Sequence, residues 1–69
     1  FMAEKYLKMA LQIKPDDAVI MDHYGDVLWM LGRKLQSNYF WKKVLNSDDA
    51  EDINKSEVKN KILNGLKNT

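Results

Sequence analysis

Residues 22–33 have the sequence Asp22-His23-Tyr24-Gly25-Asp26-Val27-Leu28-Trp29-Met30-Leu31-Gly32-Arg33. Their apolar side chains recur at helical spacing, but Gly25 lies in the middle of the predicted helix and Gly32 directly follows its end. A glycine inside a helix costs about 1 kcal/mol relative to alanine. Its presence predicts that a neighbouring element packs against the bare backbone. We expect that element to be an antiparallel helix, with Gly25 at the point of closest approach.

Three further helices are predicted around this one, and no strand. The four helices span about residues 2–14, 18–31, 34–46 and 55–66. Only the turn Gly32-Arg33 separates the second helix from the third, and a turn this short makes two helices antiparallel neighbours. The sequence therefore predicts an all-α fold built from antiparallel helix-turn-helix units.

The ends of these helices carry recognisable signals. Pro15 ends the first helix, because the residue before a proline is displaced from helical geometry. Asp16-Asp17 then supply an N-cap oxygen and negative charge for the second helix. Gly32 is expected to close that helix in the left-handed conformation. Asn54, followed three residues later by Glu57, resembles a capping box at the start of the last helix.

The apolar positions of the last three helices predict which sides are buried. On the second helix these positions are Ile20, Met21, Tyr24, Val27, Leu28 and Leu31; on the third they are Leu35, Phe40, Trp41, Val44 and Leu45; on the last they are Val58, Ile62 and Leu66, with Leu63 beside them. The other faces of the last helix carry Lys55, Lys59, Lys61 and Lys67. We interpret these lysines as a solvated face, as a terminal helix requires.

Composition excludes several classes of function. Hydrophobic residues at 45% and charged residues at 30% are typical of a soluble globular domain. With no cysteine and a single histidine, His23, neither a thiolate metal site, a two-histidine metal site nor a Ser–His triad with a spare base can be assembled. We therefore expect no enzyme activity, no cofactor and no metal. The net charge of +1 predicts no nucleic-acid partner, and no apolar run approaches the ~20 residues of a membrane span.

The third helix repeats the first at a shift of 34 residues. The shift pairs Ala3 with Ser37, Tyr6 with Phe40, Leu7 with Trp41, Ala10 with Val44 and Leu11 with Leu45. A period of 34 residues with the pattern W-x₂-L-G-x₂-Y, then A-x₃-F, then P, defines one known helical repeat. The first part of the pattern falls on Met21, Tyr24, Gly25 and Leu28, and the second part falls on Ser37 and Trp41. In the preceding unit, the Ala, Phe and Pro positions fall on Ala3, Leu7 and Pro15. The chain thus resembles the tetratricopeptide-repeat family, and its run from Gly25 to Arg33 is similar to bacterial members.

The resemblance implies a right-handed superhelical array and a division of the 69 residues within one domain. Residues 1–14 would be the second helix of a truncated repeat, residues 16–47 one complete repeat, and residues 54–67 a C-terminal capping helix. Three positions depart from the pattern: Arg33 replaces a capping Asp, Asp49 replaces the closing Pro, and Lys59 stands where a further repeat would need Gly. Phe1 before Met2 indicates a piece of a longer chain, and because terminal repeats need a polar outer face, we expect this piece to be the C-terminal end of a solenoid.

The resemblance also implies a protein–protein interaction module that binds through its concave surface. That surface would be lined by Val19, Asp22, Asp26, Trp29 and Met30. Trp29 either faces this groove or is buried by a neighbouring unit or by the last helix. The family's clamp for acidic C-terminal peptides has Lys and Asn where this chain has Asp22 and Asp26, so a basic or N-terminal segment is favoured. Without a ligand, these two aspartates are expected to be solvated on an exposed face rather than to form a weak cation site.

The first helix has a second apolar stripe with no predicted partner, formed by Met2, Tyr6, Met9 and Ile13. At about 25 cal/mol per Å², burying even ~300 Å² of this surface would contribute several kcal/mol before the cost of association. We therefore expect this edge to mediate self-association into a homo-oligomer. The alternative to a binding module is a purely structural cap on a solenoid, which self-associates as an isolated piece. A regulatory segment of a larger enzyme is a second alternative. The sequence gives no indication of cellular location.

Overall fold

The computed structural model describes residues 2–47 and 53–66. These residues form four helices and no strand, as predicted: α1 (Met2–Ile13), α2 (Ala18–Met30), α3 (Lys34–Leu45) and α4 (Lys55–Asn64). The first three helices match the predicted ranges to within a residue or two. The last helix ends earlier than predicted, because Gly65 has a positive φ of 72°. The predicted change at Asp49 lies outside the described residues.

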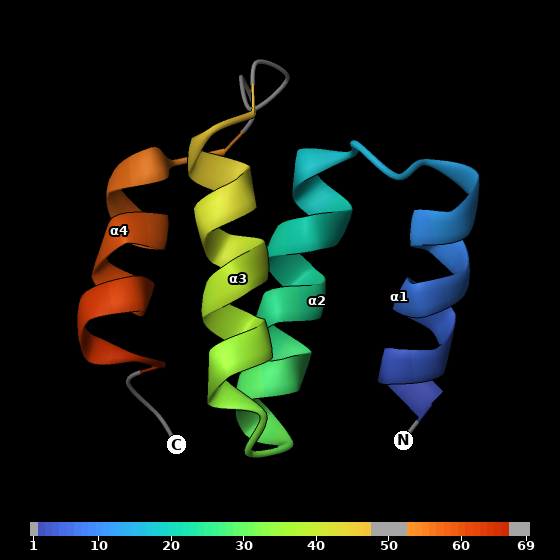
Figure 1. The fold of residues 1–69 in the computed structure, drawn as a ribbon, viewed down its shortest axis with the longest axis horizontal. Helices are drawn as coiled ribbons and strands as arrows, with labels where there is room; N and C mark the ends of the chain where they lie inside the picture. The colour runs from blue at the N-terminus through green and yellow to red at the C-terminus, as the bar shows by residue number, and fades with distance from the viewer. Residues whose placement is uncertain (1, 48–52, 67–69) are drawn as a thin grey trace.

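The α2–α3 hairpin forms the centre of the molecule (Figure 1). Successive helices run antiparallel, with α1 against α2 on one side of the hairpin and α4 against α3 on the other (Figure 1). The hairpin turn is closed by Gly32, whose φ of 82° is left-handed as predicted. The amide of Gly32 donates to the carbonyl of Trp29 at 3.0 Å, and that of Arg33 donates to the carbonyl of Leu28 at 2.9 Å. These two bonds satisfy carbonyls that a helix end otherwise leaves unpaired.

The remaining helix ends follow the predicted caps. The Asp17 carboxylate accepts a hydrogen bond from the amide of Ile20 at 3.1 Å, and the Asn54 side chain accepts one from the amide of Glu57 at 3.3 Å. Arg33 makes no side-chain cap for α3, as its position predicted. Its guanidinium instead forms an ion pair with Glu4 and so ties α1 to the hairpin turn.

The helices α2 and α3 approach each other closely at Gly25, and the neighbour of this glycine is α3, as predicted. A Cβ atom at Gly25 would lie 2.5 Å from Cδ1 and Nε1 of Trp41, a distance that real Cβ atoms do not reach. The Ser37 hydroxyl on α3 donates a 2.7 Å hydrogen bond to the Gly25 carbonyl. A bare backbone on α2 therefore provides space for the indole of Trp41, which is fully buried.

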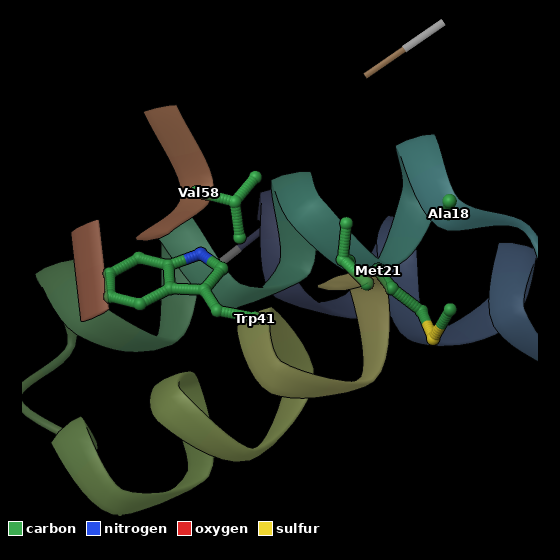
Figure 2. Packing of buried hydrophobic residues seen from close by; sticks show 5 residues of the cluster. Ala18, Met21, Trp41 and Val58 are labelled. Carbon is green, nitrogen blue, oxygen red and sulfur yellow. The ribbon is translucent and has the colours of Figure 1, made fainter. Parts of the chain in front are cut away.

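The core joins α2, α3 and α4. Ala18, Met21, Trp41, Val44 and Val58 form one cluster of buried side chains, which Figure 2 shows from close by. Tyr24, Val27 and Leu28 of α2 are buried as well. One predicted apolar position of α3 is wrong as a core residue: Leu35 is 87% exposed, at the rim of a hollow that Tyr24 of α2 also lines. Leu63 of α4 is also exposed.

Candidate partner-binding surface

The predicted groove residues lie on one face of α2. Val19, Asp22, Asp26, Trp29 and Met30 are spaced so that, at 3.6 residues per turn, their side chains leave the helix on the same side. Val19 and Met30 lie toward the two ends of this face and are 41% and 55% exposed. The other three side chains are half-buried, and thus less accessible than predicted, because α4 lies beside them.

The ammonium of Lys61 on α4 binds both aspartates of this face. Its Nζ lies 3.0 Å from Oδ1 of Asp22 and 3.0 Å from Oδ1 of Asp26. The same Asp26 oxygen accepts a 3.1 Å hydrogen bond from Nε1 of the buried Trp41. The prediction of solvated aspartates is therefore wrong: the two carboxylates are 16% and 28% exposed and are paired within the chain. The prediction that Lys61 belongs to a solvated lysine face is wrong for the same reason. Lys67 lies outside the described residues.

The charge on Lys61 is stabilised by this arrangement. Burial on its own would lower the pKa of the Lys61 amine, because it removes water from the charged form. The hydrogen bonds to Asp26 and Asp22, and their negative charges, outweigh burial and raise the pKa above its ordinary value of 10.5. The amine is therefore a permanent cation at neutral pH, and it binds the acidic pair as an ammonium.

The side chain of Trp29 is half-buried by contacts within its own chain. Its ring stacks on Trp41 with the ring centroids 5.6 Å apart and the planes 28° apart. The ammonium of Lys34 lies 4.9 Å from the centroid of the same ring. At the end of α4, a Cβ atom on Gly65 would lie 2.2 Å from the edge of the Trp29 ring. Of the two predicted surroundings for Trp29, the structure has the one in which the last helix covers part of the ring.

The predicted self-association edge is exposed along its whole length. Met2, Tyr6, Met9 and Ile13 are 84%, 75%, 56% and 79% exposed. None of the α1 residues Met2–Ile13, all of which the structure describes, is buried. Leu7, Ala10 and Leu11 lie on the opposite side of α1 and are partly buried. The edge is thus a continuous apolar stripe in contact with solvent in the single chain.

The described part of the chain has no cluster of side chains that could hold a metal ion. Within residues 2–47 and 53–66, no three His, Asp or Glu side chains lie close enough together to hold a metal ion. His23 is exposed on α2. Among the same residues, no helix has the length and apolar character that crossing a membrane requires.

Sequence reasoning missed the contact between Lys61 and the acidic pair. Its only sequence signal is that Lys61 lies three residues after Val58, at the edge of the apolar stripe of α4. Residues three apart share a helix face, so a lysine beside a buried valine reaches the same neighbour. The rotation of α4 about its axis decides which of its lysines contacts the aspartates of α2. The periodicity of apolar residues defines that rotation only coarsely.

Comparisons with known proteins identify no relative: no family model, no curated protein and no solved structure matches this chain.

Proposed function

We propose that this chain is a non-enzymatic protein–protein interaction module of the tetratricopeptide-repeat type, which binds a basic peptide or partner segment through the groove face of α2. The close approach of Gly25 to Trp41 and the turn at Gly32 are what the repeat pattern requires, and they support this assignment. Because the assignment to the family rests on residue pattern, the function inferred from it is an analogy of fold.

One observation carries the choice of ligand. Asp22 and Asp26 hold the ammonium of Lys61 between them, with exposed Val19 and Met30 toward the ends of the same face. A carboxylate pair that accepts one lysine can accept another, and apolar side chains beside it can take the aliphatic part of such a segment. In the single chain, Lys61 lies between the two carboxylates. In this proposal, a basic residue of the partner takes that position when the partner binds.

A second candidate function is a purely structural cap, and the same contact favours it. Val58 of α4 is 1% exposed, Lys61 neutralises the acidic pair, and Gly65 closes over Trp29. These features make α4 an integral part of the core. If α4 never leaves this position, the groove face has no free acidic pair, and the chain only ends the solenoid and self-associates through α1.

Removal of the Lys61 amine distinguishes the two candidates. In the Lys61→Met variant the acidic pair is open, and we expect this variant to bind a synthetic peptide of alternating Lys and Leu about tenfold more tightly than the unaltered chain does, as tryptophan fluorescence would measure. Adding Asp22→Asn should remove most of that gain, whereas adding His23→Ala, a change at the exposed neighbour, should not. If Lys61→Met binds this peptide no better than a peptide with Glu in place of Lys, the binding module is excluded and the structural cap stands.

A further inference from the structure

A second concave surface lies on the side of α2 opposite the groove face. Two adjacent hollows share Tyr24 and Phe40 as lining residues: one of about 400 Å³ lies against α2 and α3, and one of about 310 Å³ lies between α1, α2 and α3. Tyr24 is two residues from Asp22 and Asp26, and a helix turns about 200° over two residues. The two surfaces therefore face in opposite directions, and the repeat pattern predicts no role for this one.

The wall formed by α3 is aromatic and apolar. The rings of Tyr24 and Phe40 meet edge to face at 4.9 Å, and those of Phe40 and Tyr39 do so at 5.3 Å. Tyr39 is 58% exposed and Leu35, which lines the same hollow, is 87% exposed. Large, rigid aromatic side chains at the edge of a hollow are the groups that most often anchor a bound segment.

The charged side chains that line the hollows or lie over their rings are two lysines, while Glu4 of α1, one turn from Lys8, is paired with Arg33. Lys43 places its ammonium 5.4 Å from the ring of Tyr39 and 5.9 Å from the ring of Phe40. Lys8 of α1 lines the second hollow. The other lining residues are uncharged: Leu11, Gln12, Pro15, Tyr24, Leu35, Gln36, Tyr39 and Phe40. The described lining residues thus include two neutral amides but no carboxylate. The groove face, in contrast, carries the carboxylates of Asp22 and Asp26.

We propose that these two hollows together bind an acidic peptide segment with two apolar side chains. One apolar side chain occupies the hollow beside Leu35 and Tyr39, and the other occupies the hollow beside Leu11 and Pro15. Carboxylates that flank them pair with Lys43 and Lys8, since rim charges select partners of opposite sign. Each hollow is near the lower end of the size range of small-ligand pockets, which suits a single side chain. This surface is independent of the proposed basic ligand of the groove face.

The experiment uses a fluorescent hexapeptide that contains one Leu and one Phe separated by two Glu and flanked by Glu, and measures its anisotropy with the whole chain. We expect Tyr39→Ala and Lys43→Glu each to weaken binding about tenfold. Matched controls on α4, Leu63→Ala and Lys59→Glu, should leave binding unchanged, as should Asp22→Asn. Leu35→Ala should act like Tyr39→Ala, and it cannot unfold the chain by losing core contacts because its side chain is exposed.

Three results would overturn the proposal. One is that the hexapeptide fails to bind, and another is that a version with Lys in place of Glu binds equally well. The third is that the control substitutions on α4 weaken binding as much as those on α3. Circular dichroism on each variant confirms that a loss of binding is not a loss of helix.

Discussion

α1 and α4 flank the same hairpin, but they are attached to it in opposite ways. α4 inserts Val58 into the core and places Lys61 between two carboxylates of α2. α1 buries no residue fully, and its ion pair between Glu4 and Arg33 lies at the surface. Surface ion pairs contribute about 0–1 kcal/mol, whereas one buried aliphatic side chain contributes about 1.5–3 kcal/mol. A short helix can thus be fixed firmly by one apolar side chain and one well-placed lysine.

The same comparison separates surface that the chain uses for itself from surface left for others. The apolar stripe of α4 is covered within the chain, while the stripe of α1 is almost entirely exposed. On α2 the groove face is occupied by Lys61, and the opposite face opens into hollows that no described residue fills. In the single chain, the apolar surface left open thus lies mainly on the α1 side of the hairpin.

The largest difference in stability between the two flanking helices is expected when a charged residue is placed on each of them. Val58→Asp should lower the free energy of unfolding by about 3–5 kcal/mol, because an unpaired carboxylate would enter the core. Tyr6→Asp makes a comparable change at an exposed site of α1 and should alter stability by less than about 0.5 kcal/mol. Urea unfolding followed by circular dichroism measures both. Equal losses for the two variants would show that α1 is attached as firmly as α4.

The acidic pair allows a finer comparison between two neighbouring carboxylates. Asp26→Ala should destabilise the chain by about 1–3 kcal/mol, because it leaves the Nε1 donor of buried Trp41 unsatisfied as well as removing a partner of Lys61. Asp22→Ala removes only the Lys61 contact and should cost less. Chemical unfolding of both variants decides the order, and a larger loss for Asp22→Ala would refute the role given to Asp26.

The contribution of Lys61 should depend on pH in one direction only. Its pKa in the folded chain is raised above the ordinary value of 10.5, so the ammonium stabilises the fold fully below that value. The stabilisation is lost as the pH rises through the higher, folded pKa. The difference in unfolding free energy between the unaltered chain and Lys61→Met should therefore be constant from about pH 6 to pH 9 and shrink above about pH 10.5. A difference that shrinks already between about pH 6 and pH 9 would contradict this assignment.

The smallest effect on stability is expected for the stripe of α1, where the readout is association. Tyr6 and Met9 lie within a stripe at positions 2, 6, 9 and 13, a spacing of four and three residues that suits a helix–helix seam. The double change Tyr6→Ser and Met9→Gln should leave the unfolding midpoint nearly unaltered but lower any dimer fraction in sedimentation equilibrium. A chain that remains monomeric at millimolar concentration before any change would exclude self-association through this edge.

The sequence was sufficient for the four helices and for their caps, because those features depend on local chemistry. Asp17, Asn54 and Gly32 each bond to a residue three positions away, so their neighbours in the sequence define them. The close approach at Gly25 was also predictable, because a glycine inside a helix costs free energy that a closely packed neighbour can offset.

The details of the groove face were not predictable in the same way. Lys61 meets Asp22 and Asp26 across a separation of 39 and 35 residues, and that contact depends on the rotation and position of α4. Leu35 has the composition of a core residue but lies at the rim of a hollow, where it is 87% exposed. An apolar residue in a short helix has several possible neighbours, and only the packed structure selects one.

The left-handed turn at Gly32 has a consequence for the handedness of the residue that can replace it. No atom lies within 4 Å of a Cβ added at Gly32, whereas Cβ atoms at Gly25 and Gly65 would collide with indole rings. At Gly32 the only obstacle to an L-residue is therefore its chirality at a φ of 82°. A D-residue has the mirror-image preference for φ, so the backbone at D-alanine would favour this φ while restricting the unfolded chain. Chemical synthesis with D-alanine at this one position is thus expected to stabilise the hairpin without changing a residue of the groove face or of the hollows.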